Sequence, residues 1–441
     1  MRPSRHRAVV SCCCFTVKGT KFVVVRESAT PCAPVLTPPR PLWRNRDYLL
    51  LRFGETVSEF GTQASALALP LLILALTGSP AQAGLLGGLR GASYLVFGLP
   101  AGALLDRWNR RVVMVVSDTI RAIAFASIPL AVVTSHLTAV HLYAVSFIEG
   151  TLFIFFGLAA TPSLVRTVAK AQLPAAVSQG QAIDAAAAMG GPLLGGVLFG
   201  VSRMLPFIAD AVSYAISVIA TLCIRTPLTG ERIESPQNLR AEIGEGFDWM
   251  RGQRTVQLIT WISGGVNLLY GGYTLLIISL AQRHGASPTA IGLIFTTGGV
   301  GTLIGVAMTP WVQRRFTVGQ IMVGIGWLFA VTWPPYALAP TPFALGVINA
   351  LGFLLVPIYN GTHFAYRLML IPEPLQGRIN SINRLVTFGG QAIGFVLMGA
   401  LIQWYGPVAT VWITFIPATV LAVLISLNVN LRRAGKIADV V

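Results

Sequence analysis

Twelve long apolar runs decide what this chain can fold into. Each has roughly the 20 residues that a helix needs to cross a bilayer. Because no water reaches the backbone inside a bilayer, such a run forms a helix that satisfies its own hydrogen bonds. The predicted spans are 53–77, 83–105, 112–134, 138–161, 178–202, 204–224, 256–280, 288–311, 318–338, 341–364, 382–403 and 408–430. The predicted fold class is an all-α membrane protein with twelve transmembrane helices.

The composition excludes several other classes of protein. Charged residues make up only 11% of the chain, against about 25% in soluble proteins. The net charge of +16 does not indicate a nucleic-acid partner, because apolar runs separate the basic residues. The five cysteines have no ligand or disulfide spacing, so we predict no metal site and no cofactor. No span pairs a nucleophile with a base, so we do not expect an enzyme.

The basic residues predict the topology. With an even number of spans and both termini inside, 28 of the 32 Lys and Arg residues fall in inner segments. Cytoplasmic loops accumulate these residues, so the count of spans and the orientation support each other. Only Arg203 and Arg283 fall in outer loops, and Arg90 and Arg121 lie within spans. Both termini are therefore expected on the cytoplasmic side.

A polar stretch at residues 225–254 divides the chain into two sets of six spans. Within it, Ile243, Phe247 and Met250 have helical spacing, which predicts an amphipathic helix on the inner membrane surface. The predicted segments are a disordered cytoplasmic tail (1–46), a six-helix bundle (47–224), a cytoplasmic linker (225–254), a second six-helix bundle (255–430) and a cytoplasmic tail (431–441).

The two halves share sequence features. Ser79-Pro80 at the start of span two corresponds to Ser287-Pro288 at the start of span eight, and glycines at similar spacing occur in spans five and eleven. Gene duplication is the simplest explanation. Two duplicated bundles can expose a central site to either side of the membrane by rocking, a mechanism called alternating access.

The loop between spans two and three carries a charged motif. Its residues are Gly102, Asp106, Arg107, Arg110 and Arg111. They resemble the loop signature of the major facilitator superfamily, Gly-x-x-x-Asp-Arg-x-Gly-Arg-Arg, with Asn109, which tolerates a left-handed backbone, in place of Gly. The resemblance implies two pseudo-symmetric six-helix bundles. It also implies a gate in which Asp106 contacts the N-terminal end of helix eleven near Gly377 and Arg378 when the cavity faces outward.

Span five carries a second motif. Gly191, Pro192, Gly195 and Gly196 resemble the Gly-Pro-x-x-Gly-Gly motif of exporters in the superfamily, which implies export by antiport. Glycines four residues apart let another backbone approach, and the proline permits a bend. A role in packing alone is the alternative.

Other passages match the family unevenly. Span four has Ser146 where the family has an arginine, and Glu149-Gly150 where it has Gln-Gly, so any proton relay must be built differently here. Residues 173–196 and 377–381 resemble the branch that contains bacterial macrolide-efflux and enterobactin-exporter carriers.

Acidic residues inside the spans carry the functional hypothesis, because each is costly unless paired, protonated or hydrated. Glu59, Glu149 and Asp184 are the candidates for proton coupling, since burial favours the neutral form of a carboxyl group and lets it exchange a proton. Hydrogen bonding within the packed bundle is the alternative. Two further acids are expected in ion pairs, Asp118 with Arg121 one helical turn away and Asp210 with Arg90 across helices.

The spans of the second half contain polar but uncharged side chains and no acidic residue. Candidates for lining a substrate cavity are Asn267, Tyr270, Asn349, Tyr359 and Asn360. Helix contacts are the alternative for each of them. His363, near the inner end of span ten, is expected to be a surface or capping residue.

These features predict an exporter of small amphipathic molecules, such as drugs, macrolides or siderophores, in a bacterial plasma (inner) membrane. Its expected partners are the small-molecule substrate, protons and the lipid bilayer. Uptake or facilitated transport by the same fold is one alternative. A receptor or assembly factor that does not transport is another.

Overall fold

A computed structural model describes most of the chain. The described residues are 13–17, 20–24, 41–98, 100–105, 108–228, 239–432 and 435. The chain divides into two compact units, Met1–Pro41 and Leu42–Val441. In the first unit, strands β1 (Cys13–Val17) and β2 (Thr20–Val24) pair antiparallel. The sequence analysis predicted no regular structure there.

Helices make up the second unit. The first half contains η1 (Leu42–Arg44), α1 (Arg46–Thr77), α2 (Pro80–Phe97), α3 (Pro100–Leu105), α4 (Arg110–Val133), α5 (Ala139–Thr167), η2 (Lys170–Gln172), α6 (Leu173–Val201) and α7 (Leu205–Cys223). The linker contains α8 (Leu239–Gly252). The second half contains α9 (Arg254–Gly271), α10 (Tyr273–Arg283), α11 (Pro288–Arg315), α12 (Val318–Leu338), α13 (Pro342–Leu370), α14 (Glu373–Leu427) and α15 (Val429–Arg432).

The number of helices is compatible with twelve spans. Among the described residues, ten helical segments are long and apolar enough to cross a membrane. The set does not include α2, which has 18 residues and contains Arg90. It counts α14 once, although Gly406 has a non-helical φ of 78° that separates the two predicted spans on either side. Predicted span two breaks between α2 and α3, and span seven breaks at Gly272 between α9 and α10.

Polar caps explain why several helices begin where they do. The Ser79 and Ser287 hydroxyls accept hydrogen bonds from backbone N–H groups in the first turns of α2 and α11. The next residue is proline in both helices, which suits a first helical position because no intrahelical bond is lost there. The repeated Ser-Pro pair thus marks equivalent helix starts in the two halves.

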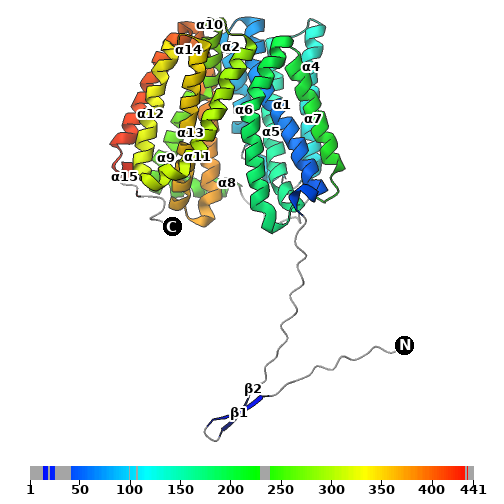
Figure 1. Cartoon of the computed structure of the whole chain (residues 1–441), viewed down its shortest axis with the longest axis vertical. Coiled ribbons are helices and arrows are strands. Elements are labelled where there is room, and N and C mark those ends of the chain that lie inside the picture. Colours follow the sequence, from blue (N-terminus) through cyan, green and yellow to red (C-terminus); the bar gives the residue numbers. More distant parts are fainter. Residues whose placement is uncertain are drawn as a thin grey trace, which may run out of the picture. The chain divides into compact units, whose positions relative to one another are not determined.

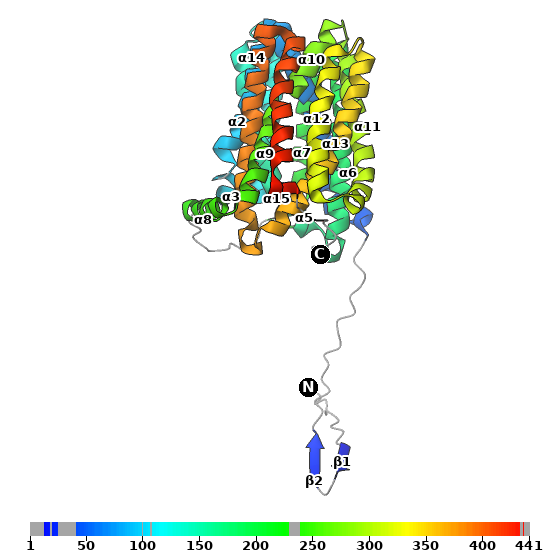
Figure 2. The same ribbon diagram turned by 90° about the vertical axis from the view of Figure 1, so that its left-hand side faces the viewer.

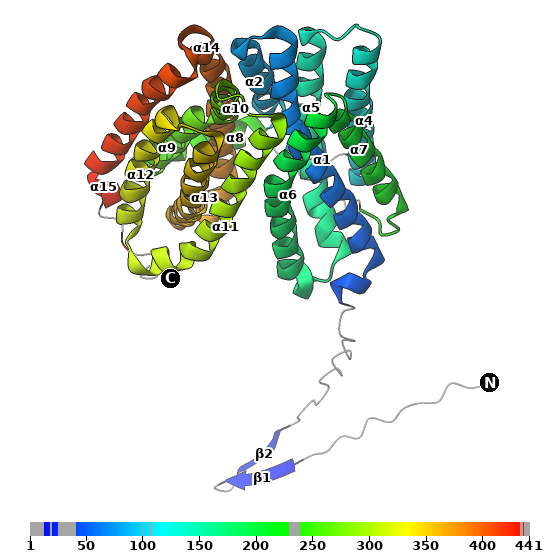
Figure 3. The ribbon, with the colours of Figure 1, turned by 45° about the horizontal axis from the view of Figure 1, so that its top comes forward.

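Each half packs as its own bundle (Figures 1 and 3). In the first, α1 packs against α6 and α7, and α4 packs against α5 and α7. In the second, α11 packs against α13, and α14 packs against α9 and α12. The bundles meet where α2 contacts α14 and where α6 contacts α11.

Close approaches between the bundles begin near one end of the helices. This end carries the turns at Gly78, Ser135, Gly285 and Gly406, and the charge distribution predicts that it faces outward; we call it the outer end. A Cβ placed on Gly84 of α2 would lie 2.8 Å from Cα of Gly399. One placed on Gly292 of α11 would lie 3.0 Å from Cα of Leu193. Side chains at either glycine would separate the bundles.

The opposite end carries the linker helix. In Figure 2, α8 runs across the ends of the long helices. Met250 of α8 is buried in a cluster with Val256, Ile371, Ile379 and Ile382. Glu245 of α8 forms an ion pair with Arg378 near the start of α14. The linker helix is thereby attached to the second bundle.

Candidate functional site

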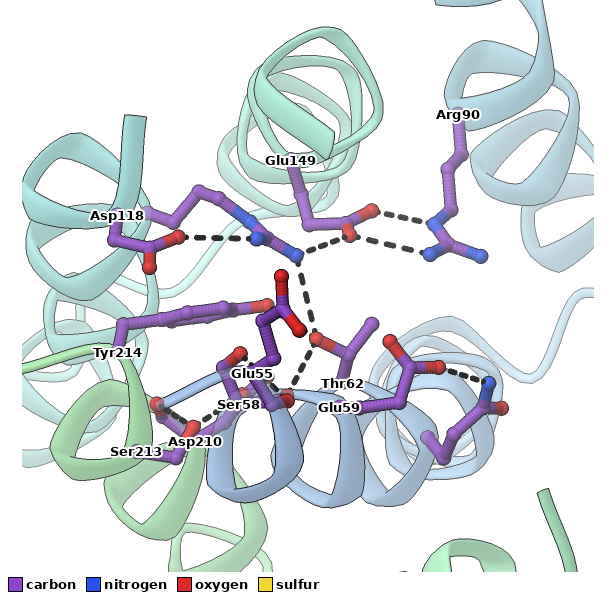
Figure 4. Close-up of polar contacts among 12 residues, drawn as sticks. Glu55, Ser58, Glu59, Thr62, Arg90, Asp118, Glu149, Asp210, Ser213 and Tyr214 are labelled. Carbon is purple, nitrogen blue, oxygen red and sulfur yellow. Dashed lines mark hydrogen bonds and ion pairs between the residues drawn. The ribbon is translucent and has the colours of Figure 1, made fainter. Parts of the chain in front are cut away.

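An ionic cluster joins three helices of the first bundle (Figure 4). Glu149 of α5 binds the Arg90 guanidinium of α2 through both carboxylate oxygens. It also accepts a hydrogen bond from Arg121 Nη2 of α4 at 3.2 Å. The other guanidinium nitrogen, Arg121 Nη1, lies 3.2 Å from Asp118 Oδ1, and this pair was predicted. Two guanidiniums and two carboxylates therefore compensate one another, as buried charges require.

Burial is unequal within this cluster. Glu149 and Arg121 are each 2% exposed, and Asp118 is 1% exposed. The side chain of Arg90, in contrast, is 38% exposed. Of these four residues, Arg90 has the most exposed side chain, and its helix is one of those that contact the second bundle.

Hydrogen bonds and a cation–π contact extend the cluster to α1 and α7. The guanidinium carbon of Arg121 lies 4.1 Å from the ring centroid of Tyr214 on α7. The Tyr214 hydroxyl is 2.8 Å from Thr62 Oγ1 on α1, and Arg121 Nη2 donates to the same Thr62 oxygen at 3.3 Å. One arginine thus connects side chains of four helices.

The other acidic residues lie in different environments. Glu59 of α1 accepts a hydrogen bond from Gln63 at 2.8 Å. In Figure 4 its carboxylate points toward the side on which Glu149 and Arg90 lie. Ion pairs between described residues do not include Glu59. Glu55 is paired with Arg52 at 2.7 Å, and Asp184 of α6 is exposed.

The glycines of the span-five motif lie at two helix contacts. A Cβ on Gly195 of α6 would lie 2.9 Å from Cα of Ala64 on α1, inside the first bundle. A Cβ on Gly196 would lie 3.2 Å from Cα of Gly292 on α11, in the second bundle. These two neighbouring glycines therefore allow one helix to approach two others closely. Pro192 lies inside the same helix.

The charged loop is described only in part. Gly102 lies in α3, whereas Asp106 and Arg107 lie outside the described residues. Arg111 donates hydrogen bonds to the carbonyls of Ile224 and Thr226, after α7. Asn109 has an extended backbone, with φ −70° and ψ 115°, and its side chain caps α4 by accepting from the Arg111 N–H. The left-handed turn used to explain this asparagine is wrong, because helix capping explains it instead.

Comparison with known proteins identifies the family. Residues 53–263 match the family model described as Major Facilitator Superfamily. This part of the chain, from α1 into α9, belongs to that superfamily. Its relatives include the multidrug efflux pump Tap of Mycolicibacterium fortuitum, 25% identical over 85% of this chain and 94% of that protein. Macrolide efflux protein A of Streptococcus pyogenes is 26% identical over 80% and 89%, and the uncharacterized MFS-type transporter YfiS of Bacillus subtilis is 24% identical over 83% and 89%.

Solved structures share the fold over most of the chain. The nucleoside transporter NupG superposes with a TM-score of 0.69 at 15% identity, covering 87% of this chain and 98% of its own. A bacterial homologue of the iron transporter ferroportin in an inward-facing state gives 0.64 at 19% identity, covering 86% and 98%. The chain is a multi-pass membrane transporter of the major facilitator fold.

Within that fold, Ser146 stands where the family signature has an arginine on helix four. Ser146, at that position, donates to the Leu86 carbonyl at 3.0 Å and ties α5 to α2. The guanidiniums come instead from Arg90 and Arg121, on neighbouring helices. The predicted pair of Arg90 with Asp210 is wrong, since Arg90 binds Glu149. Depth in the membrane, which residue counting gives, does not specify the direction in which a side chain points.

Asp210 forms a local contact. It is fully buried and accepts a hydrogen bond from the Ser213 hydroxyl at 3.2 Å. Its second oxygen, Oδ2, has no hydrogen-bond partner among the residues that the structure describes. A Cβ on Gly61 would lie 2.5 Å from its Oδ1, so α1 approaches this carboxylate closely.

The predicted cavity residues of the second half have mixed environments. Asn349 is fully buried and donates to the Ile294 carbonyl at 2.7 Å, so it joins helices. Tyr270 and Tyr359 line a cavity of about 20 Å³, which has room for one water molecule at most. Asn267 donates to the Ser263 carbonyl of its own helix at 2.9 Å, and Asn360 is exposed.

His363 differs from its prediction. It is 6% exposed, and its ring stacks on Tyr359 with the centroids 5.4 Å apart. The prediction of a surface or capping histidine is wrong, because α13 continues to Leu370 and places His363 two turns inside the helix.

Proposed function

We propose that this protein exports small amphipathic molecules by proton antiport with alternating access. The efflux relatives and the glycine contacts of α6 support this proposal. The observation that carries it is a mid-membrane group of carboxylates and guanidiniums of which one member, Arg90, has a side chain that the protein covers only in part. Such a group can bind a proton in one conformation and release it in another.

Within this group, Glu59 is the better proton acceptor and Glu149 the better anchor. A proton on Glu149 would leave the buried guanidinium of Arg121 and the partly exposed one of Arg90 with only Asp118 to balance them, which is costly in a medium of low dielectric constant. Glu59 is bound by an amide and has no described ion pair. Its carboxylate nevertheless points toward the side on which Glu149 and Arg90 lie (Figure 4). Protonation of Glu59 therefore changes the field at the cluster without breaking a salt bridge.

Arg90 links proton binding to movement. With Glu59 ionised, the exposed Arg90 guanidinium is attracted by two carboxylates, Glu149 and Glu59. With Glu59 neutral, Glu149 alone attracts it. Because α2 carries Arg90 and also contacts α14, a change in the position of this side chain reaches the interface between the bundles.

Substitution of Glu59 tests the coupling step. Glu59→Gln should abolish substrate accumulation driven by a proton gradient in proteoliposomes, yet retain exchange of labelled for unlabelled substrate. Glu55→Gln, one helical turn away, is the matched control and should retain both activities. Glu149→Gln should lose both, because it removes the counter-charge of two arginines. Proton-driven accumulation by Glu59→Gln at the wild-type rate would reject Glu59 as the coupling site.

Inside-out vesicles test the direction of transport. With an acidic lumen, antiport accumulates a substrate in the lumen, whereas symport depletes it. Macrolides and the other drugs of an antibiotic panel are the substrates to screen, because relatives are efflux pumps. Depletion would favour uptake by the same fold. A receptor or assembly factor would move no member of the panel in either direction.

A further inference from the structure

The outer end contains a cavity between the two bundles. Its volume is about 630 Å³, within the range of small-molecule sites. The first bundle contributes Leu74 and Phe199 to its wall, and the second contributes Ile291 and Ile402. Pro80 and Pro288 also line it, and Gly84 and Gly292 lie one helical turn further in. The cavity is thus situated outside the contacts that close the outer end.

The polar lining of this cavity is basic. Arg203, which follows α6, and Arg283, at the end of α10, both line it. They are the two basic residues that the topology places in outer loops. Among the described residues of the lining, none is acidic, and no described carboxylate pairs with either arginine. The guanidiniums come from different bundles and repel each other unless an anion lies between them.

Two polar side chains of α10 also line the cavity. Ser279 is one of them, and its Oγ is buried and has no hydrogen-bond partner among the described residues. Gln282, one turn along α10, offers an amide at the exposed rim.

We propose that this cavity binds an amphiphilic organic anion from the outer medium. Its apolar body packs against the leucine, isoleucine and phenylalanine side chains, and its acidic group lies between Arg203 and Arg283. Because the two arginines belong to different bundles, the bound anion holds the outer ends together. The site is separate from the carboxylates of the ionic cluster, and it does not depend on the proposed transport reaction.

Naphthalene-2-sulfonate is a suitable probe, and naphthalene-2-sulfonamide is its neutral counterpart. Titration calorimetry on the full-length protein in lipid nanodiscs should show sulfonate binding at least tenfold tighter than sulfonamide binding. Arg203→Gln with Arg283→Gln should reduce the sulfonate affinity at least tenfold and leave the sulfonamide affinity unchanged. Arg166→Gln, an exposed arginine outside the cavity, is the control and should bind both probes as the wild type does.

A second variant tests the location. Ala75→Trp, on the cavity wall, fills the space without changing charge and should abolish binding of both probes. Equal affinity for the two probes in the wild type would reject the anion site, as would sulfonate binding that survives the double arginine substitution. Sulfonate binding that survives Ala75→Trp would place the site elsewhere. Glu59→Gln should bind the sulfonate normally, so failure of the coupling proposal and failure of this one give different results.

Discussion

At the scale of single residues, one arginine holds the first bundle together. Arg121 contacts Asp118, Glu149, Thr62 and Tyr214, which belong to four helices. Replacing a buried ion pair with apolar side chains is often tolerated, but removing one partner leaves a charge without compensation. Without Arg121, the buried Asp118 carboxylate would lose its ion-pair partner, whereas Glu149 would still be paired with Arg90. The unpaired charge of Asp118 would therefore be the larger destabilising effect.

Arg121→Gln should therefore destabilise the protein by about 3–5 kcal/mol. Thermal unfolding in detergent measures the loss, with the exposed Arg166→Gln as control, which should change stability by no more than roughly 0.5 kcal/mol. Adding Asp118→Asn to Arg121→Gln should recover part of the loss, since it removes the uncompensated carboxylate. Additive losses in the double variant would contradict the assigned role of this pair.

Contacts within one helix could be predicted from the sequence, whereas contacts between helices could not. Asp118 and Arg121 were predicted to pair because three residues along a helix bring side chains to one face. The partner of Arg90 was predicted wrongly, because a contact between helices depends on how each helix is rotated. Glu149 was singled out by its cost in a bilayer, and the two guanidiniums that compensate it could not be identified from spacing. Apolar length, in contrast, is a local property, and it predicted nearly all the helices.

At the scale of helices, glycines determine which elements approach one another. Gly195 faces α1 and Gly196 faces α11, so α6 is packed tightly on two sides. In a membrane, where lipid is as apolar as the side chains, helix association depends on this kind of close packing. The glycines that resemble an antiport motif thus also allow α6 to pack closely against α1 and α11.

Gly195→Ala should destabilise the first bundle by about 1–3 kcal/mol, because its Cβ meets the backbone of Ala64. Gly157 of α5 is the matched control, since a Cβ there meets no atom within 4 Å. Gly157→Ala should be neutral or stabilise the helix by up to about 1 kcal/mol. Thermal unfolding measures the stability of both variants. An equal change in stability for the two would show that the contact of Gly195 with Ala64 is not tight.

At the scale of the whole molecule, the bundles are closed at the outer end. The contacts at Gly84 with Gly399 and at Gly196 with Gly292 join the bundles there, and Ser79 donates to Gln403 at 2.9 Å in the same region. The opposite arrangement, with Asp106 against the start of α14, stays a prediction. In this structure Arg378 at that site pairs with Glu245 of the linker helix.

Gly84→Ala should shift the conformation without unfolding either bundle, because the atoms nearest to its Cβ, Phe395 O at 2.5 Å and Gly399 Cα at 2.8 Å, belong to the other bundle. Spin labels at His136→Cys and Pro340→Cys, in a background without native cysteines, would report the distance between the outer loops. We expect a longer distance and slower transport in the variant. An unchanged distance with normal transport would show that this contact does not limit closure.

The position of Arg90 next to Gly91 has a mechanical consequence. Adjacent residues of a helix point about 100° apart, so Gly91 faces Ala392 of the second bundle while Arg90 faces Glu149. A roll of α2 about its axis cannot move one of these two residues without moving the other. Rotation of helix α2 therefore couples the ion pair of Arg90 with Glu149 in the first bundle to the close contact of Gly91 with Ala392 in the second.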